Sequence, residues 1–220
     1  MWCIATINQQ YIDRMQDINR LYALPYDKNE PIVCIDEKPY QILENARPSL
    51  SLKTEVGLRV DCDYIRKGTC NIFVGVEPKG GFRHTRVTEH RKKQDYVSFF
   101  LEICHLYRDA KKIHIVCDNL NIHKLSSLQS ILSPNHPVFS RVVLHFTPIH
   151  ASWQNLAEVE IGILSRQCLN RRIPTFAQVK GEVAAWNGYR NCSHAQITWR
   201  LTESKAQAKY HLTHQNLLLS

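Results

Sequence analysis

Two aspartates, Asp36 and Asp118, each follow a short apolar run that is typical of a buried strand. The runs are Ile32–Ile35 and Ile113–Cys117, and both are rich in β-branched residues. An aspartate after a strand commonly forms a turn, so either residue alone favours a structural role. The repeated arrangement favours a site, because two neighbouring strands that end this way would bring two carboxylates together. A third carboxylate is then expected nearby.

The third carboxylate is predicted on a helix that begins at Ser152 as its N-cap and runs to about residue 169. Glu158 and Glu160 lie two positions apart on different faces of this helix, so only one can join the aspartates. We favour Glu158, because Gly162 would lie one turn further on the same face and leave room for a metal or substrate. The alternative is that both glutamates are surface residues. The apolar stripe predicted to pack on the sheet consists of Leu156, Val159 and Ile163.

The overall charge points to a polyanionic substrate. The 220 residues contain 28 Lys and Arg against 20 Asp and Glu, a formal net charge of +8. A basic protein with an acidic site suggests a polyanion handled through metal ions, although a basic surface could serve solubility alone. The eight cysteines lack the spacing of a zinc site and suggest a reducing, cytoplasmic setting. No apolar run is long enough for a membrane span or resembles a signal peptide.

The elements that would position these acids follow an α/β order. The order is a first strand, a three-strand meander, then helix, strand, helix, strand and helix. This order is typical of the ribonuclease H-like fold, with one five-stranded mixed sheet flanked by helices. The predicted division is a helical lead-in over 1–29, a catalytic domain over 30–192 and a C-terminal extension over 193–220. Predicted strands cover residues 31–36, 58–66, 69–77, 82–88, 113–117, 141–146 and 197–201, with Lys67-Gly68 as a hairpin turn. Predicted helices cover residues 8–22, 93–107, 124–132 and 152–169, with others starting near Thr175 and Thr202.

Three blocks of the sequence resemble the signature blocks of mariner-superfamily transposases. They are Asp36–Pro39, Asp118–His123 and Ser152–Glu158, and more narrowly they resemble the six-thirty group of bacterial insertion sequences. The resemblance covers about residues 3–205, and three ordered blocks are far more specific than one. It implies a ribonuclease H-like domain that cuts and joins DNA. The implied catalytic triad is Asp36, Asp118 and Glu158.

The resemblance also implies a metal-dependent reaction. Two Mg²⁺ ions, with Mn²⁺ as a substitute, would neutralise charge on the attacking and leaving oxygens. Asp36 would bridge both ions, Asp118 would hold one and Glu158 the other. The implied partner is double-stranded DNA, both transposon ends and target. A homodimer in the bacterial cytoplasm is the candidate assembly.

Several polar residues near these blocks are candidates for DNA contacts. The asparagines could instead form turns or caps, the histidine could have a structural role, and the basic residues could belong to an exposed charged face. Asp61 and Asp63 are rival metal ligands, with a solvated strand face as their alternative. The candidate DNA-binding residues are Lys38, Asn119, Asn121, His123, Asn155, Arg166, Arg171 and Arg172.

Two departures from the family pattern bear on the function. The sequence has Ala151-Ser152-Trp153-Gln154 in place of the more usual Gly-Ser-Trp-Leu, and it lacks the N-terminal helix-turn-helix region of such enzymes. With the leucine-rich tail at 217–219, these departures predict a truncated, split or decayed gene product. Two alternatives to a transposase stay open. One is a stand-alone nuclease of the same fold, and the other is a non-enzymatic remnant that binds DNA or oligomerises.

Overall fold

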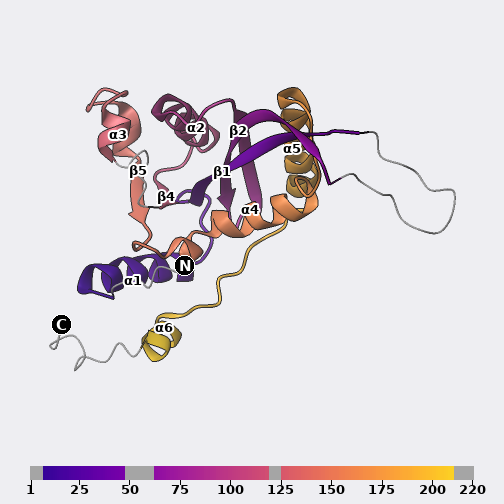
Figure 1. The fold of residues 1–220 in the computed structure, drawn as a ribbon. Helices are drawn as coiled ribbons and strands as arrows, with labels where there is room; N and C mark the ends of the chain where they lie inside the picture. The colour runs from indigo at the N-terminus through magenta and orange to yellow at the C-terminus, as the bar shows by residue number, and fades with distance from the viewer. Residues whose placement is uncertain (1–6, 48–61, 119–124, 211–220) are drawn as a thin grey trace.

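A five-stranded mixed sheet with the strand order β3-β2-β1-β4-β5 is the centre of the computed structural model, which describes residues 7–47, 62–118 and 125–210 (Figure 1). Strand β1 is antiparallel to β2 and parallel to β4, while β2 is antiparallel to β3 and β4 is parallel to β5. The predicted five-stranded mixed sheet is confirmed. The strands are β1 (Ile32–Asn45), β2 (Tyr64–Glu77), β3 (Phe82–Thr88), β4 (Ile113–Cys117) and β5 (Val142–Phe146).

Helices flank this sheet. The first buries Ile12, Met15 and Ile18 after an Asn8 cap, as its spacing predicts. Among the described helices, none is both long and apolar enough to cross a membrane. The helices are α1 (Gln9–Ala23), α2 (Lys93–Leu106), α3 (Leu125–Gln129), α4 (Leu156–Gln167), α5 (Phe176–Cys192) and α6 (Glu203–Tyr210), with short 3-10 turns η2 (Pro137–Ser140) and η3 (Ser152–Gln154).

Alternating residues of the strands face different helices. Val33 and Ile35 of β1 and Phe73 of β2 share one buried cluster with the aromatic side chains of α2. The intervening residue Cys34 clusters instead with the start of α4 and the end of α1. Further along β2, Ile72 clusters with α4 and α5. This period-two alternation places α2 on one face of the sheet and α4 with α5 on the other.

The predicted hairpin turn at Lys67-Gly68 is wrong, because both residues lie inside the single strand β2. The pairing of β1 with β2 changes register between Gln41 and Leu43, opposite these two residues. Gly68 has a φ of 113°, a backbone conformation that glycine adopts readily. The pair therefore forms a bulge within a long strand. The sequence pattern alone does not distinguish such a bulge from a hairpin turn between two strands.

Two further strand predictions are corrected. Strand β1 does not end at residue 36, as predicted, but continues through Pro39 to Asn45. Its pairing with β4 covers only Ile32–Cys34, so Pro39 lies where one edge of β1 has no strand partner in the described ranges. Proline is tolerated at such edges. The predicted strand at 197–201 is absent from the described structure, in which this segment is an irregular strap whose Ile197 N–H donates to the Pro78 carbonyl.

Candidate active site

Asp36 and Asp118 lie on neighbouring strands where β4 ends, although Asp36 is inside β1, which continues to Asn45. Cys34 of β1 pairs with Val116 of the parallel strand β4. Asp36 comes two residues after Cys34, and Asp118 comes two residues after Val116. Residues two apart on a strand point to the same face of the sheet. The two aspartates therefore lie at equivalent positions beside the carboxyl end of β4, on the face that α4 covers.

The start of α4 is held beside Asp36 by Asn155. The Nδ2 of Asn155 donates to the carbonyl oxygen of Ile35 at 2.8 Å and to Oδ2 of Asp36 at 3.3 Å. Its Oδ1 caps the helix by accepting from the N–H of Ala157 at 3.2 Å. Glu158 lies in the first turn after this cap. One fully buried amide therefore connects the strand that carries the first acid to the helix that carries the third.

Negative charges act on one another in this site. Asp36 is only 5% exposed, Asp118 is half-buried and Glu158 is exposed. Burial is the main cause that raises the pKa of Asp36 to about 8; the charges of Glu158 and Asp118 also raise it, and a hydrogen bond from the Glu37 N–H lowers it. No described Lys or Arg side chain forms an ion pair with Asp36 or Glu158. The three carboxylates therefore repel one another.

The donor chemistry of these three carboxylates fits a hard divalent cation, because carboxylate oxygens are the ligands that Mg²⁺ and Mn²⁺ prefer. A bound cation would also relieve the repulsion that raises the pKa of Asp36. As they stand, no three His, Cys, Asp or Glu side chains within the described ranges are grouped closely enough to hold a metal ion. Convergence of Asp36, Asp118 and Glu158 on shared metal ions therefore stays a prediction.

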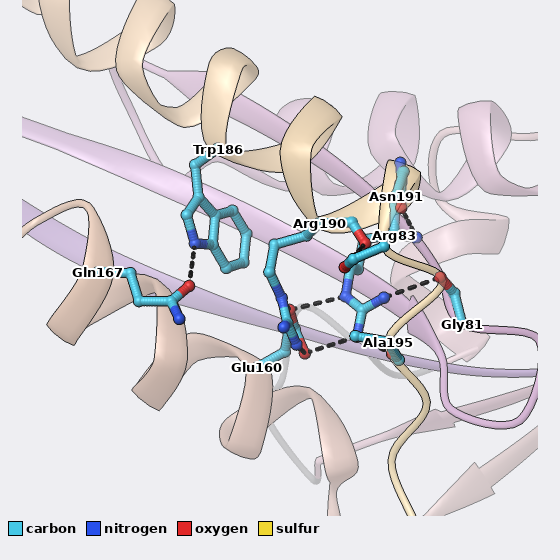
Figure 2. Close-up of polar contacts among 9 residues, drawn as sticks. Gly81, Arg83, Glu160, Gln167, Trp186, Arg190, Asn191 and Ala195 are labelled. Carbon is cyan, nitrogen blue, oxygen red and sulfur yellow. Dashed lines mark hydrogen bonds and ion pairs between the residues drawn. The ribbon is translucent and has the colours of Figure 1, made fainter.

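The second acid of α4, Glu160, points away from this site, as predicted. Figure 2 shows its carboxylate between two guanidinium groups, Arg83 from β3 and Arg190 from α5. The side chains of Glu160 and Arg83 are both fully buried, at 0% exposure. The sequence analysis did not anticipate these arginines. The only signal for them is that an acid at a buried helix position requires a positive partner.

The structure corrects both the predicted start of α4 and its predicted apolar stripe. Ser152 begins the turn η3, and the helix starts only after Asn155. Val159 is 42% exposed, so it is not part of the buried stripe. Glu160 takes a core position instead, which is possible because two guanidinium groups neutralise it. The buried residues of α4 are Leu156, Ala157, Glu160, Ile161 and Leu164.

The candidate DNA-contacting residues near the acids differ in their surroundings. Lys38 is half-buried in β1, two residues after Asp36. Arg166 is exposed and lies two turns after Glu158 on the same face of α4, with its Nη1 3.4 Å from where a Cβ on Gly162 would stand. Both remain predicted phosphate contacts. Asn119, Asn121 and His123 lie outside the described residues.

The other two arginine candidates already have protein partners. Arg171 forms an exposed ion pair with Glu182 at 2.5 Å. Arg172 donates to Oδ1 of Asn45 at 3.0 Å and to the carbonyl oxygens of Cys62 and Asp63 at 3.1 and 2.8 Å. Arg172 thus ties the far ends of β1 and β2 together. The rival ligand Asp63 lies at this end of β1, away from Asp36, and Asp61 is outside the described residues.

Comparison with known protein families and structures gives a consistent result. A family model described as "DDE superfamily endonuclease" matches residues 31–180, a range that includes all three candidate acids. A crystal structure of the Mos1 mariner paired end complex with Mn matches at a TM-score of 0.58 and 13% identity, covering 89% of this chain and 60% of that chain. The Mos1 Strand Transfer Complex matches at a TM-score of 0.57 and 12% identity, covering 89% and 61%. The mariner Mos1 paired end complex with Mg matches at 0.56 and 12%, covering 96% and 65%.

The two kinds of match support different conclusions. At these identities the likeness to Mos1 establishes the fold, which is the ribonuclease H-like fold of DDE transposases. The present chain spans less than two thirds of the length of those Mos1 chains. No curated protein matches the sequence. The family model matches more than half of the chain and extends from β1 into α5. The protein therefore belongs to the DDE superfamily endonuclease family.

Proposed function

We propose that this protein is the catalytic part of a bacterial insertion-sequence transposase, which cuts DNA and joins the freed 3′ end to a target. The observation that carries this proposal is the buried Asp36, which is fixed by Asn155 at the start of α4 and is electrostatically coupled to Glu158 and Asp118. Neighbouring carboxylates in a DDE superfamily endonuclease are the ligands that a metal-dependent phosphodiester reaction requires. We assign this activity to residues 30–192.

Asp36, Asp118 and Glu158 would hold two Mg²⁺ ions, for which Mn²⁺ can substitute. When bound, such ions supply neutralisation of the charge on the attacking and leaving oxygens of the phosphodiester. The chain itself contributes the placement of the ligands. Asn155 orients Oδ2 of Asp36 and leaves the other Asp36 oxygen bonded to the Glu37 N–H at 2.8 Å. The relatives solved with Mn and with Mg support this choice of metal.

The DNA contacts would come from the surface around these ligands. The exposed Arg166 on the Glu158 face of α4 and the half-buried Lys38 beside Asp36 would contact phosphates. Asn119, Asn121 and His123 follow Asp118 in the sequence and would lie near the DNA backbone. Arg171 and Arg172 would need to exchange protein partners to do so. The paired-end complexes among the relatives support a dimer that holds two DNA ends.

The direct test is divalent-metal-dependent nicking of supercoiled plasmid and of end-labelled duplex DNA. We expect nicking by the parent in Mn²⁺ or Mg²⁺ and none in excess chelator. Asp118→Asn should lower nicking by roughly a thousandfold, because one metal ligand loses its charge. Exposed Glu182, which pairs with Arg171, supplies the matched control Glu182→Gln. Equal nicking by the parent and Asp118→Asn, prepared identically, would contradict the proposal.

A second candidate is a nuclease that cuts DNA without joining it, and the endonuclease description of the matching family favours it. The same three acids would serve this reaction, so the point variants do not separate the two functions. A strand-transfer assay does. Pre-cut duplex ends with free 3′ hydroxyls are incubated with target plasmid, and joined products identify a transposase. Nicking without joined products across several end sequences identifies the nuclease.

A further inference from the structure

The buried ion cluster around Glu160 has a geometry that fixes orientation. The Nε of Arg83 donates to Oε1 of Glu160 at 2.7 Å and its Nη2 to Oε2 at 3.1 Å. The Nε of Arg190 donates to Oε1 at 2.9 Å and its Nη2 to Oε2 at 3.2 Å. Each guanidinium therefore binds both carboxylate oxygens in a fork, which permits only one relative orientation of the groups.

The remaining donors of Arg83 connect the cluster to the surrounding chain. Its Nη1 donates to the Gly81 carbonyl at 2.8 Å, and its Nη2 also donates to the Ala195 carbonyl (Figure 2). The side chain of Asn191 exchanges two hydrogen bonds of 2.8 Å with the backbone N–H and carbonyl of Arg83. The cluster thus joins α4 to β3, to the end of α5 and to the strap that follows it. Of these segments, only α4 contains a candidate acid, Glu158.

Helix α4 is consequently fixed at two points that flank Glu158. The first is Asn155, whose side chain bonds Ile35 and Asp36 of β1 at the helix start. The second is Glu160, two residues beyond Glu158 and roughly 200° around the helix axis. The buried apolar residues of α4, such as Ile161 and Leu164, also hold the helix against the sheet, but apolar contacts are not directional. The forked contacts of Glu160 are directional, so they restrict the rotation of the helix further and help to set the direction in which Glu158 points.

A buried ion cluster contributes little net stability, so its presence here suggests a role in orienting the helix. Desolvation of three charges costs about as much as their attraction returns, and apolar replacements are often equally stable. The four hydrogen bonds from Arg83 and Arg190 hold the carboxylate of Glu160 in one orientation.

We propose that Glu160, Arg83 and Arg190 are positioning residues, which set the rotation of α4 so that Glu158 faces Asp36. This inference rests on the proposed function, since it concerns how the third metal ligand is placed. The three residues touch neither DNA nor metal in this proposal. They act through the helix that carries Glu158.

The test separates positioning from stability by replacing the whole cluster. The triple variant Arg83→Met/Glu160→Leu/Arg190→Met exchanges it for apolar side chains and should fold with similar stability. Arg190→Lys is a milder variant that keeps the charge but loses the fork at a side chain that is 14% exposed. Mn²⁺ affinity of each variant is measured by calorimetry without DNA, beside kcat and KM for nicking. Circular dichroism and urea unfolding check the fold.

We expect Mn²⁺ affinity and kcat to fall about tenfold in Arg190→Lys and more in the triple variant, with KM for DNA unchanged. Glu158→Gln serves as the reference for loss of the ligand itself. Folded variants with Mn²⁺ affinity and kcat within about twofold of the parent would overturn the positioning role, and Arg190→Lys decides the matter if the triple variant does not fold. If Glu158→Gln itself leaves Mn²⁺ binding and nicking unchanged, it is the proposed function that fails.

Discussion

Glu158 and Glu160 lie two residues apart on the same helix, yet they occupy opposite electrostatic environments. Glu160 is fully buried and contacts two guanidinium groups, so positive charge exceeds negative charge around it. Glu158 is exposed, and its charge is the second cause, after burial, that raises the pKa of the buried Asp36 to about 8. The comparison shows that neither burial nor residue type alone identifies the acid that we propose as a metal ligand. The balance of neighbouring charge does, because a site intended for a cation leaves negative charge unpaired.

The largest expected effect is a loss of activity when Glu158 is replaced. Glu158→Gln should lower metal-dependent nicking by roughly a thousandfold, because a metal ligand loses its charge. Its free energy of unfolding in chelator should change by less than about 0.5 kcal/mol, as for other exposed substitutions. Plasmid nicking and urea unfolding measure the two quantities. A variant that nicks normally would remove the distinction between the two glutamates.

Replacement of Glu160, whose charge Arg83 and Arg190 neutralise, should instead lower the stability of the protein. Glu160→Gln leaves two buried guanidinium groups without a counter-charge and should lower the free energy of unfolding by about 3–5 kcal/mol. The control Glu182→Gln breaks the exposed ion pair with Arg171 and should cost less than about 1 kcal/mol. Urea unfolding of both proteins gives the comparison. A loss for Glu160→Gln no larger than that of the control would show that the buried cluster is not tightly coupled to the fold.

The pH dependence of stability sharpens the comparison further. An unfolded Asp ionises near pH 3.9, whereas the pKa of folded Asp36 is about 8. The folded state therefore keeps a proton that the unfolded state loses, and the contribution of Asp36 to stability falls as pH rises from about 4 to 8. Asp36→Asn removes this penalty. In chelator its stability relative to the parent should increase by on the order of 3 kcal/mol across that range. A pH-independent difference would contradict a buried, repelled carboxylate.

Divalent metal should stabilise the protein only through the site formed by Asp36, Asp118 and Glu158. Mn²⁺ at about a hundredfold excess over its dissociation constant should stabilise the parent by about 2.7 kcal/mol at pH 8. Glu158→Gln should lose most of this gain, and Glu182→Gln should keep it. Thermal unfolding with and without Mn²⁺ reports the difference. Equal gains in all three proteins would indicate that the metal binds elsewhere.

The smallest effect concerns the two kinds of arginine. Arg166→Gln should lower DNA affinity a few-fold and reduce the salt slope of binding by about 1, since one phosphate contact is lost. Arg172→Gln should affect stability instead, because Arg172 bonds Asn45 and the carbonyls of Cys62 and Asp63. Binding to a fluorescent duplex across a salt series separates the two variants. A salt slope that Arg166→Gln leaves unchanged would remove this residue from the DNA surface.

The parts of the fold that depend on local pattern could be predicted from the sequence. Helix α1 and its buried residues follow from apolar spacing, and Thr175 caps α5 as its position predicts. The bulge at Lys67-Gly68 could not be predicted, because a glycine with positive φ suits a turn as well as a bulge. Within the site, the parallel placement of Asp36 and Asp118 follows from two similar strands.

The partners of Glu160 could not be predicted, for a different reason. Arg83 and Arg190 lie far from Glu160 in the sequence, on β3 and α5, and only the packed fold brings them together. The pattern-based stripe of α4 therefore treated Val159 as buried, whereas it is 42% exposed. A charged residue in a core position disrupts the apolar periodicity on which such predictions depend. The choice of Glu158 over Glu160 rested on their different faces of the helix and on Gly162, one turn beyond Glu158.

The topology of β1 has a consequence for how the protein reaches its folded state. Strands β1, β2 and β3 form an antiparallel meander, whereas the parallel pairing of β1 with β4 joins residues as distant as Ile32 and His114. Long-range pairing is slower because closing a long loop costs more entropy. We infer that β2 and β3 gain protection first, which pulse-labelled hydrogen exchange would test by comparing their amides with those of β4. On this inference Asp36 and Asp118 meet only in the last stage of folding, so partly folded chains lack the neighbouring carboxylates of the candidate site.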